Sequence, residues 1–205
     1  MILKKIYLIR HGQTGYNKMG IVQGRGIDTT LSELGHKQSH AFFKAYKEVP
    51  FDKVYTSALQ RTHQTVKPFL DLGIEWKILP GLDEISWGIS EGMTYEDENN
   101  KQYYKIINSW KSGNVTEKIE GGESPIDVME RQKEAIDYIL SDNGQTVLVC
   151  MHGRALRILL AWITGRHLKE QDAFAHDNLS LYVLNYDGEK LEIEKHDDRA
   201  HLQVI

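Results

Sequence analysis

The sequence contains a single cysteine, Cys150, among its 205 residues. One thiol cannot form an internal disulfide, so the chain is not a disulfide-stabilised secreted scaffold, and the reducing cytoplasm suits it. Long apolar runs are also missing, because the longest one, 155–163, contains an arginine and is too short to cross a bilayer. The N-terminal apolar segment is short and is interrupted by Lys4 and Lys5, unlike a signal peptide. We therefore expect a cytoplasmic protein with no membrane partner.

Nor does the chain have a surplus of basic residues. Lysine and arginine total 25 against 29 aspartates and glutamates, which gives a formal net charge of −4. This balance argues against nucleic acid as a partner. Histidines with metal-ligand spacing are scarce as well. His36 and His40 lie four residues apart on one predicted helix, but the sequence offers no third ligand beside them, so we expect no metal site there.

What the chain does contain is a regular alternation of short apolar segments and segments with a helical pattern. Runs of β-branched and aromatic residues predict strands at 1–9, 53–56, 74–79 and 146–151. Ser32, Ser57 and Ser124-Pro125 are typical of helix starts and predict helices over 32–48, 58–70 and 124–140. A fourth helix, 154–164, is expected directly after the strand at 146–151. Two further alternating segments, 178–185 and 190–194, flank Asp187-Gly188, which is a strong hairpin signal.

This order of elements predicts an α/β fold in which a mostly parallel sheet has helices on both faces and an antiparallel edge. The pattern loosens between Gly81 and Gly122, where only a polar helix near 95–110 is expected. We interpret residues 83–122 as an insertion or lid on a single domain of residues 1–205. The tail after His196 is polar.

The segment Arg10-His11-Gly12 directly follows the first predicted strand. It places a cation, an imidazole and a flexible backbone at the strand's carboxyl end, where ligands bind in open α/β sheets. A glycine-containing loop then extends to residue 31, and loops of that length in a compact domain are usually functional. We predict that His11 is a nucleophile and that Arg10 binds an oxyanion beside it.

Two other strand ends carry polar residues that should meet the first. Arg61 follows the second strand, one turn into the next predicted helix. His152-Gly153 ends the strand at 146–151. Two arginines, two histidines and two helix N-termini at one crevice predict a site for a multiply charged anion. Phosphate fits best, because guanidinium groups match its oxygens.

Glu84 is the candidate that would turn a binding site into a reactive one. Neutral imidazole can attack phosphorus near neutral pH, but the leaving alkoxide needs a proton. Glu84 follows the third strand and precedes a glycine-rich turn, so it can lie at the same edge of the sheet. Asp83 competes for this role, and the residue pattern alone does not separate the two.

Together these motifs resemble the signature of the histidine phosphatase superfamily, the phosphoglycerate mutase-like proteins. The similarity covers nearly the whole chain, and its segments occur in the family's order. They are Arg10-His11-Gly12 with Thr14 and Asn17, Gln23-Gly24 with Asp28, Leu31 and Gly35, the segment 56–62 containing Arg61, Leu82-Asp83-Glu84 with Gly88 and Glu91-Gly92, Gly122-Glu123-Ser124, and Met151-His152-Gly153. Thr30 and Met151 depart from the family's usual residues and bear on the shape of the pocket.

The resemblance implies a three-layer α/β/α fold with His11 as the phosphorylated nucleophile. It implies that Arg10, Arg61 and His152 hold the phosphoryl group, and it favours Glu84 over Asp83 as general acid and base. A second set of residues would line the substrate or phosphate site: Asn17, Gln23, Gly24 and Gly153. No metal or other cofactor is implied, because arginine and histidine supply the positive charge.

The insertion bears on which branch of the family the chain resembles. Mutases of the family carry a longer insertion with a basic pair that binds a second phosphate. Residues 95–122 here are rich in acidic residues and asparagine and have no adjacent arginines. We therefore expect a phosphatase, similar to alpha-ribazole phosphatase and broad-specificity relatives, that hydrolyses a small phosphomonoester. A phosphoglycerate mutase-type enzyme is the alternative. A non-catalytic phospho-ligand module fits less well, because it would need neither His11 nor Glu84.

Other histidines and aromatic residues are expected to have structural roles. Trp87 is close enough to Glu84 in the sequence to line the pocket. The remaining histidines are expected at the surface or in structural positions: His63, His167, His176, His196 and His201.

Overall fold

A computed structural model of the chain, which describes residues 3–97 and 100–205, is built around one mixed sheet. Within this part of the chain the sheet has six strands in the order β3-β2-β4-β1-β5-β6. Four of them run parallel: β1 (Lys4–Arg10), β2 (Lys53–Thr56), β3 (Glu75–Ile78) and β4 (Thr146–Met151). The hairpin of β5 (Leu181–Tyr186) and β6 (Leu191–Asp198) adds an antiparallel edge next to β1. The predicted mostly parallel sheet with an antiparallel edge is confirmed.

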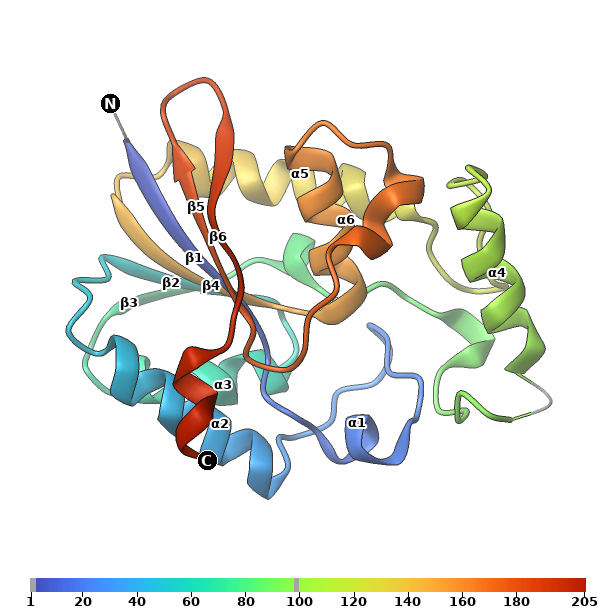
Figure 1. The fold of residues 1–205 in the computed structure, drawn as a ribbon, viewed down its shortest axis with the longest axis horizontal. Coiled ribbons are helices and arrows are strands. Elements are labelled where there is room, and N and C mark those ends of the chain that lie inside the picture. Colours follow the sequence, from blue (N-terminus) through green and yellow to red (C-terminus); the bar gives the residue numbers. More distant parts are fainter. Residues whose placement is uncertain (1–2, 98–99) are drawn as a thin grey trace.

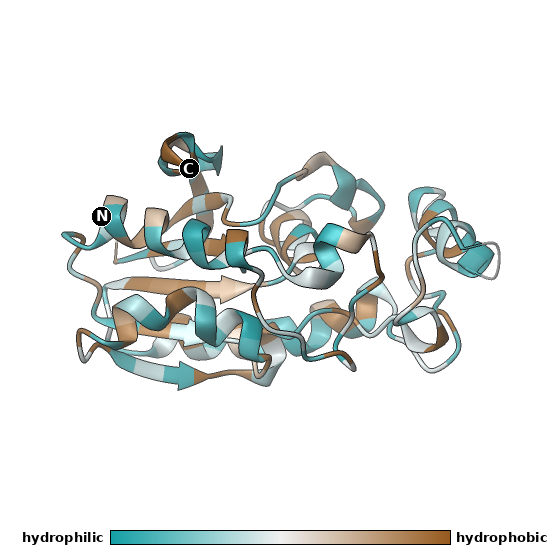
Figure 2. Ribbon diagram, turned by 90° about the horizontal axis from the view of Figure 1, so that it is seen from below, coloured by the Kyte–Doolittle hydropathy of each residue, from teal (hydrophilic) through white to brown (hydrophobic). Residues whose placement is uncertain are grey.

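Helices cover both faces of the sheet and make three layers (Figure 1). On one face lie α2 (Glu33–Tyr46) and α3 (Gln60–Leu70), and on the other lie α5 (Pro125–Ser141) and α6 (Gly153–Ile163). The central strands have continuous apolar sequences because successive side chains point to opposite faces of the sheet, and both faces are covered by helices. In β4, Val147 and Val149 pack towards α5 and α6, whereas Leu148 and Cys150 pack towards α2 and α3. Figure 2 shows hydrophobic colours on interior strands between the two helical layers.

Two of the three predicted helix caps are present, and the third is wrong. Ser32 and Ser124 accept hydrogen bonds from the backbone of the first turns of α2 and α5, and Pro125 opens α5 as expected. Ser57 does not cap α3, which begins at Gln60 without any side-chain cap. Its hydroxyl lies 2.7 Å from His152 Nε2 instead, so this serine belongs to the polar site described below.

The segment 83–122 leaves the sheet and returns to it. It contains η2 (Gly88–Ser90) and α4 (Lys101–Lys111), and η1 (Pro80–Leu82) precedes it. The helix was expected from about residue 95, but residues 95–97 form a turn, 98–99 lie outside the described residues, and Asn100 Nδ2 donates to Thr94 O at 3.0 Å before α4 begins. In Figure 1, α4 stands beyond the end of the sheet. The division into one domain with a lid at 83–122 stays a prediction.

Several short elements were not expected from the sequence. A five-residue helix, α1 (Gly15–Met19), interrupts the long loop, with Thr14 and Asn17 forming a reciprocal cap at its start. At the other end of the chain, η5 (Ala200–Val204) follows β6 and buries His201 against Phe42 of α2. The polar tail is thus partly folded onto α2. Another 3₁₀ helix, η4 (Leu168–Ala173), follows α6. Among the described residues, no helix combines the length and the apolar character needed to span a bilayer.

Candidate active site

A cavity of about 230 Å³ opens at the carboxyl ends of β1 and β4. Its lining contains three arginines and one carboxylate, so the charge balance favours an anionic ligand. We call Arg10, His11, Arg61 and His152 the base of the site. The base combines residues from the ends of two neighbouring parallel strands with one from the start of α3, which is where the sequence placed a common ligand site.

His11 lies in the cavity wall with only 2% of its surface exposed. Its Nδ1 lies 2.7 Å from the carbonyl oxygen of Gly12, and since a carbonyl can only accept, Nδ1 carries the proton. The Nε2 atom therefore keeps its lone pair. Burial, together with the charges of Arg61 and Arg10, lowers the pKa of His11 well below its ordinary value. The ring is thus a neutral imidazole with a free nucleophilic nitrogen.

Arg10 supplies the positive charge beside this ring. Its Nε is buried and has no hydrogen-bond partner among the described residues. Burial lowers the pKa of Arg10, although an arginine remains charged at neutral pH. A buried guanidinium with an unused donor is costly unless a ligand completes it. The position of Arg10 in the lining suits it to bind an oxyanion there.

Arg61 and His152 lie behind His11, because both are completely buried and neither lines the cavity. The Arg61 Nε donates to His152 Nδ1 at 3.1 Å, and its terminal nitrogens donate to the carbonyls of Ile27 and Gly24 at 2.7 and 3.3 Å. His152 Nε2–H then donates to Ser57. Burial and the charge of Arg61 lower the pKa of His152 well below its usual range. Both side chains therefore lie behind the cavity wall, and the expectation that they hold the phosphoryl group stays a prediction.

The position of Arg61 in its helix explains its burial. Because α3 begins at Gln60, Arg61 is the second residue of the helix and not one turn into it. From there its side chain turns into the protein and reaches His152, whose ring centroid lies 5.1 Å from that of His11. Burial is the main reason that the pKa of Arg61 falls to about 10, so it is still a cation at pH 7. The positive charge of Arg61 therefore lies close to the ring of His11 and lowers its pKa.

Glu84 also lines the cavity, and it occupies the N-terminus of α6. Its carboxylate accepts from the backbone N–H groups of Arg154 at 3.0 Å and Ala155 at 2.8 Å, and from its neighbour Ile85 at 2.9 Å. The partial positive charge of a helix N-terminus stabilises such an anion. The helix end that was expected to face phosphate thus also binds the Glu84 carboxylate.

Asp83, the rival of Glu84, points the other way. One of its oxygens accepts from the Ala58 N–H at 2.8 Å, and the other pairs with Arg25 at 3.0 Å. It is 97% buried and does not line the cavity. Asp83 thus ties the loop after β3 to the start of α3, and the geometry leaves Glu84 as the carboxylate that faces a ligand.

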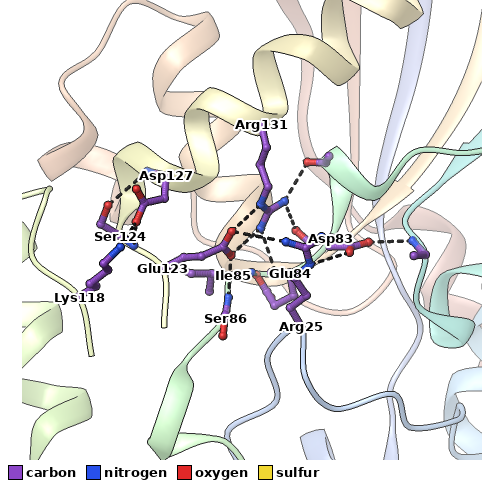
Figure 3. A network of polar contacts seen from close by, with 12 residues as sticks. Arg25, Asp83, Glu84, Ile85, Ser86, Lys118, Glu123, Ser124, Asp127 and Arg131 are labelled. Atoms are coloured by element: carbon purple, nitrogen blue, oxygen red, sulfur yellow. Dashed lines mark hydrogen bonds and ion pairs between the residues drawn. The ribbon is translucent and has the colours of Figure 1, made fainter. Parts of the chain in front are cut away.

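Arg131 of α5, which the sequence did not single out, fixes the loop that carries Glu84 (Figure 3). Its NH1 donates to the carbonyls of Gly81 and Asp83 at 2.9 and 2.8 Å, and its NH2 donates to the carbonyl of Glu84 at 2.9 Å. The remaining N–H groups form a two-pronged pair with the Glu123 carboxylate at 2.9 and 3.0 Å. All five donors of the guanidinium are used, so Arg131 holds three carbonyls of one short loop in fixed places.

The predicted substrate-contacting residues divide into two groups. Asn17, Gln23 and Gly153 line the cavity. A Cβ on Gly153 would lie 3.4 Å from Arg10 Nε and 3.6 Å from Glu84 Oε2, so a side chain there would fill the space between the two charged groups. Gly24 does not line the cavity, and its carbonyl instead accepts from Arg61.

The rest of the cavity lining is formed by residues that the sequence left mostly unassigned. We call this set the upper wall: Trp87, Tyr95, Tyr103, Arg154, Arg157 and His176. Only Trp87 was considered for the lining, and His176 was expected at the surface or in a structural position. No motif marks these residues, because they come from the insertion, α6 and the segment before β5, and they meet only in the folded chain.

The two arginines of the upper wall change the comparison with a mutase pocket. The insertion lacks adjacent arginines as expected, but Arg154 and Arg157 of α6 both reach the cavity. Each donates to Asp172 at 2.8 Å. Although burial opposes it, Arg154 and Arg157 lower the pKa of Asp172 below its usual value, so this carboxylate neutralises part of the pair. A basic pair is therefore present, but it comes from α6.

In the described part of the chain, no group of three or more histidine, cysteine, aspartate or glutamate side chains is placed to hold a metal ion. The pair considered from the sequence is exposed on α2, where His40 Nδ1 binds the backbone carbonyl of His36.

Comparisons with known proteins agree with the chemistry of this site. A family profile described as histidine phosphatase superfamily (branch 1) matches residues 6–199. The curated protein named "Putative phosphoserine phosphatase 2" from Hydrogenobacter thermophilus is 28% identical over 189 residues, which cover 92% of each chain. One named "Probable phosphoglycerate mutase GpmB" from Yersinia enterocolitica is 29% identical over 212 residues, 98% of this chain and 95% of that one.

A solved structure supports the same fold. The alpha-ribazole phosphatase from Shigella flexneri superposes with a TM-score of 0.84 at 24% identity, covering 95% of this chain and 96% of the other. This likeness extends over the sheet and its flanking helices. Because the family profile matches nearly the whole chain, the protein belongs to the histidine phosphatase superfamily, branch 1.

Proposed function

We propose that this enzyme hydrolyses a small phosphomonoester through a phosphohistidine formed on His11. The observation that supports this most directly is the state of the His11 ring, because its Nδ1–H is fixed on the Gly12 carbonyl and its Nε2 lone pair is left for attack. Arg10 lies beside it with a buried donor unused. The charge of Arg61 lies behind it and, with Arg10, favours a dianionic phosphate.

The reaction runs in two steps that use the same residues. In the first, Nε2 of His11 attacks phosphorus, and the bond to the ester oxygen breaks as Glu84 donates a proton to that oxygen. In the second, Glu84 takes a proton from water, the water oxygen attacks phosphorus, and the bond to His11 breaks. A phosphate beside Glu84 brings two anionic groups together, and their repulsion favours uptake of one proton between them.

The remaining predicted residues have supporting roles in this proposal. Arg61 and His152 hold the His11 side of the site, and the Gly24 carbonyl orients Arg61. Asn17, Gln23 and Gly153 border the bound phosphomonoester. The chemistry requires no metal, since arginines and a helix N-terminus supply the positive charge.

We also propose that the enzyme acts on free metabolites in the cytoplasm. The single thiol, Cys150, is completely buried, so the fold does not depend on an oxidising compartment. The net charge of −4 gives no general attraction for nucleic acid.

The test is hydrolysis of p-nitrophenyl phosphate by wild-type protein and by His11→Ala, with and without EDTA. We expect the substitution to lower kcat/KM by about 10⁴-fold or more, because it removes the nucleophile. EDTA should have no effect. Rapid quenching with ³²P-labelled substrate should trap an acid-labile, alkali-stable phosphoprotein only in the wild type. His36→Ala removes an exposed histidine of α2 and serves as the matched control. Equal turnover in His11→Ala would contradict the proposal.

Phosphoryl transfer of the mutase type is the second candidate, and Arg154 with Arg157 is the observation that favours it. A basic pair in the upper wall can bind a second anionic group. Incubation with 3-phosphoglycerate, with and without 2,3-bisphosphoglycerate, separates the two functions. A phosphatase releases inorganic phosphate, whereas a mutase forms 2-phosphoglycerate in a reaction that depends on the bisphosphate.

A further inference from the structure

His176 lines the cavity and carries an unused hydrogen-bond acceptor. It precedes β5 and is 7% exposed. Its Nδ1 lies 2.9 Å from the carbonyl oxygen of Phe174, which can only accept, so Nδ1 carries the proton and Nε2 has the lone pair. That Nε2 is buried and has no hydrogen-bond partner among the described residues. Since His176 lines the cavity, a ligand can supply the missing donor.

The surroundings of His176 keep its ring neutral. Burial, followed by the charges of Arg10, Arg157 and Arg154, lowers the pKa of His176 to about 3. The Phe174 carbonyl acts in the opposite direction but does not outweigh them. The lone pair on Nε2 is therefore available throughout the range in which a cytoplasmic enzyme works.

Apart from Nε2 of His11, which the proposed reaction uses, the carboxylate and amide oxygens of the cavity already have partners. Glu84 accepts from three backbone N–H groups. Asn17 Oδ1 accepts from the Thr14 N–H at 3.1 Å and from Asn178 at 3.2 Å. Gln23 Oε1 accepts from Thr29. Buried polar atoms normally find a partner, so an acceptor left open in a cavity lined by donors points to a donor on the ligand.

We propose that the substrate is a phosphomonoester whose organic part carries a hydroxyl group, and that this hydroxyl donates to Nε2 of His176. The inference rests on the proposed hydrolysis at His11. A cavity of about 230 Å³ contains both residues, so one small molecule can contact both. An ammonium group is disfavoured as the donor, because Arg10, Arg154 and Arg157 repel a cation at this place.

Matched alkyl phosphates test this. The monophosphates of ethane-1,2-diol, propane-1,3-diol and butane-1,4-diol are compared with n-propyl, n-butyl and n-pentyl phosphate, in which a methyl group replaces the terminal hydroxyl. The three chain lengths test which separation of phosphate and hydroxyl group matches the separation of His11 and His176. For at least one pair we expect kcat/KM to favour the hydroxyl compound by about tenfold, because the methyl analogue leaves the acceptor unpaired. 2-Aminoethyl phosphate should be hydrolysed less efficiently than 2-hydroxyethyl phosphate.

Two variants connect the preference to His176. His176→Phe keeps the ring shape and removes the acceptor, so the hydroxyl-to-methyl ratio should fall to about one. His176→Gln places an amide oxygen near the position of Nε2 and should keep part of the ratio. A ratio of one for every pair in the active wild-type enzyme would overturn the inference, as would an unchanged preference in His176→Phe. Failure of the wild type to hydrolyse any of the six esters would instead contradict the proposed function.

Discussion

The base of the site and its upper wall are built in different ways. In the base, protein partners fix three of the four side chains: His11 binds the Gly12 carbonyl, and Arg61 and His152 bind each other. The fourth, Arg10, has a buried Nε without a partner among the described residues. The upper wall joins residues from the insertion, α6 and the segment before β5, and one of its polar atoms, Nε2 of His176, has no partner among the described residues. The base thus leaves an unused donor, Arg10 Nε, beside a fixed nucleophile, whereas the upper wall leaves an unused acceptor, His176 Nε2.

This difference suggests that the base carries out the reaction and that the upper wall selects the substrate. Protein hydrogen bonds fix the ring of His11 and the pair of Arg61 and His152 behind it, and an attack on phosphorus requires such a fixed nucleophile. An upper wall with an open acceptor and a basic pair instead distinguishes one ester from another. Substitutions of base residues, or of residues that position Glu84, should therefore lower turnover of every phosphomonoester. Substitutions in the upper wall should instead change the relative kcat/KM values of different phosphomonoesters.

Glu84→Gln should have the largest effect of the substitutions that follow. The amide keeps the shape but cannot exchange a proton, so kcat should fall by about 10²–10⁴-fold for esters with poor leaving groups. The loss should be smaller for p-nitrophenyl phosphate, whose leaving group needs no proton. Steady-state kinetics with both kinds of ester measures this. Asp83→Asn is the control, and it should lower stability more than turnover because Asp83 pairs with Arg25 and Ala58. The assignment fails if Asp83→Asn loses the greater part of kcat and Glu84→Gln does not.

Arg131→Lys should have the next largest effect. A lysine cannot replace five planar donors, so the carbonyls of Gly81, Asp83 and Glu84 would lose their common partner. We expect kcat to fall by about 10–100-fold with little change in KM, since the carboxylate moves while Arg10 and His11 stay. The dependence of kcat on the pKa of the leaving group should become steeper, as in Glu84→Gln. Arg25→Lys, at the more exposed end of the same network, is the matched control. A loss of stability with unchanged kcat would make Arg131 purely structural.

The sequence predicted the sheet, its four flanking helices and most of the base because the relevant signals are local. A buried strand ending in Arg10-His11-Gly12 or His152-Gly153 places its last residues at the same sheet edge wherever the chain goes next. The predictions failed where a residue distant in the sequence competed with a local signal. Ser57 has the composition of a helix cap, but its hydroxyl is taken by His152, and α3 begins three residues later. Competition from a distant partner is not visible in a sequence window.

The upper wall could not be predicted for a different reason. Arg154 and Arg157 read as polar positions of a helix, and His176 as one histidine in an irregular segment. Their common direction depends on how α6 and η4 pack, which is a tertiary property. Asp83 and Glu84 were likewise inseparable by composition, and only the loop held by Arg131 determines which one faces the cavity.

The pH dependence of stability gives the smallest and most specific test of the upper wall. His176 has a pKa of about 3 in the folded protein, whereas an unfolded histidine titrates near pH 6.5. Its contribution to stability is thus complete above about pH 6.5 and is lost as the pH falls from there towards 3, because the unfolded chain then binds a proton that the folded protein does not. Between pH 4 and 6, the wild type should lose about 1.4 kcal/mol per pH unit more than His176→Phe.

Urea unfolding at pH 4.5, 5.5, 6.5 and 7.5 measures that difference. His176→Gln is a second non-titrating variant, so it should show the same reduced slope as His176→Phe even if its absolute stability differs. Equal slopes in the wild type and both variants would mean that His176 can take up a proton in the folded protein at mild pH. Its Nε2 would then be a donor in acid, and the preference for hydroxylated esters should disappear below that pH while hydrolysis at the base of the site continues.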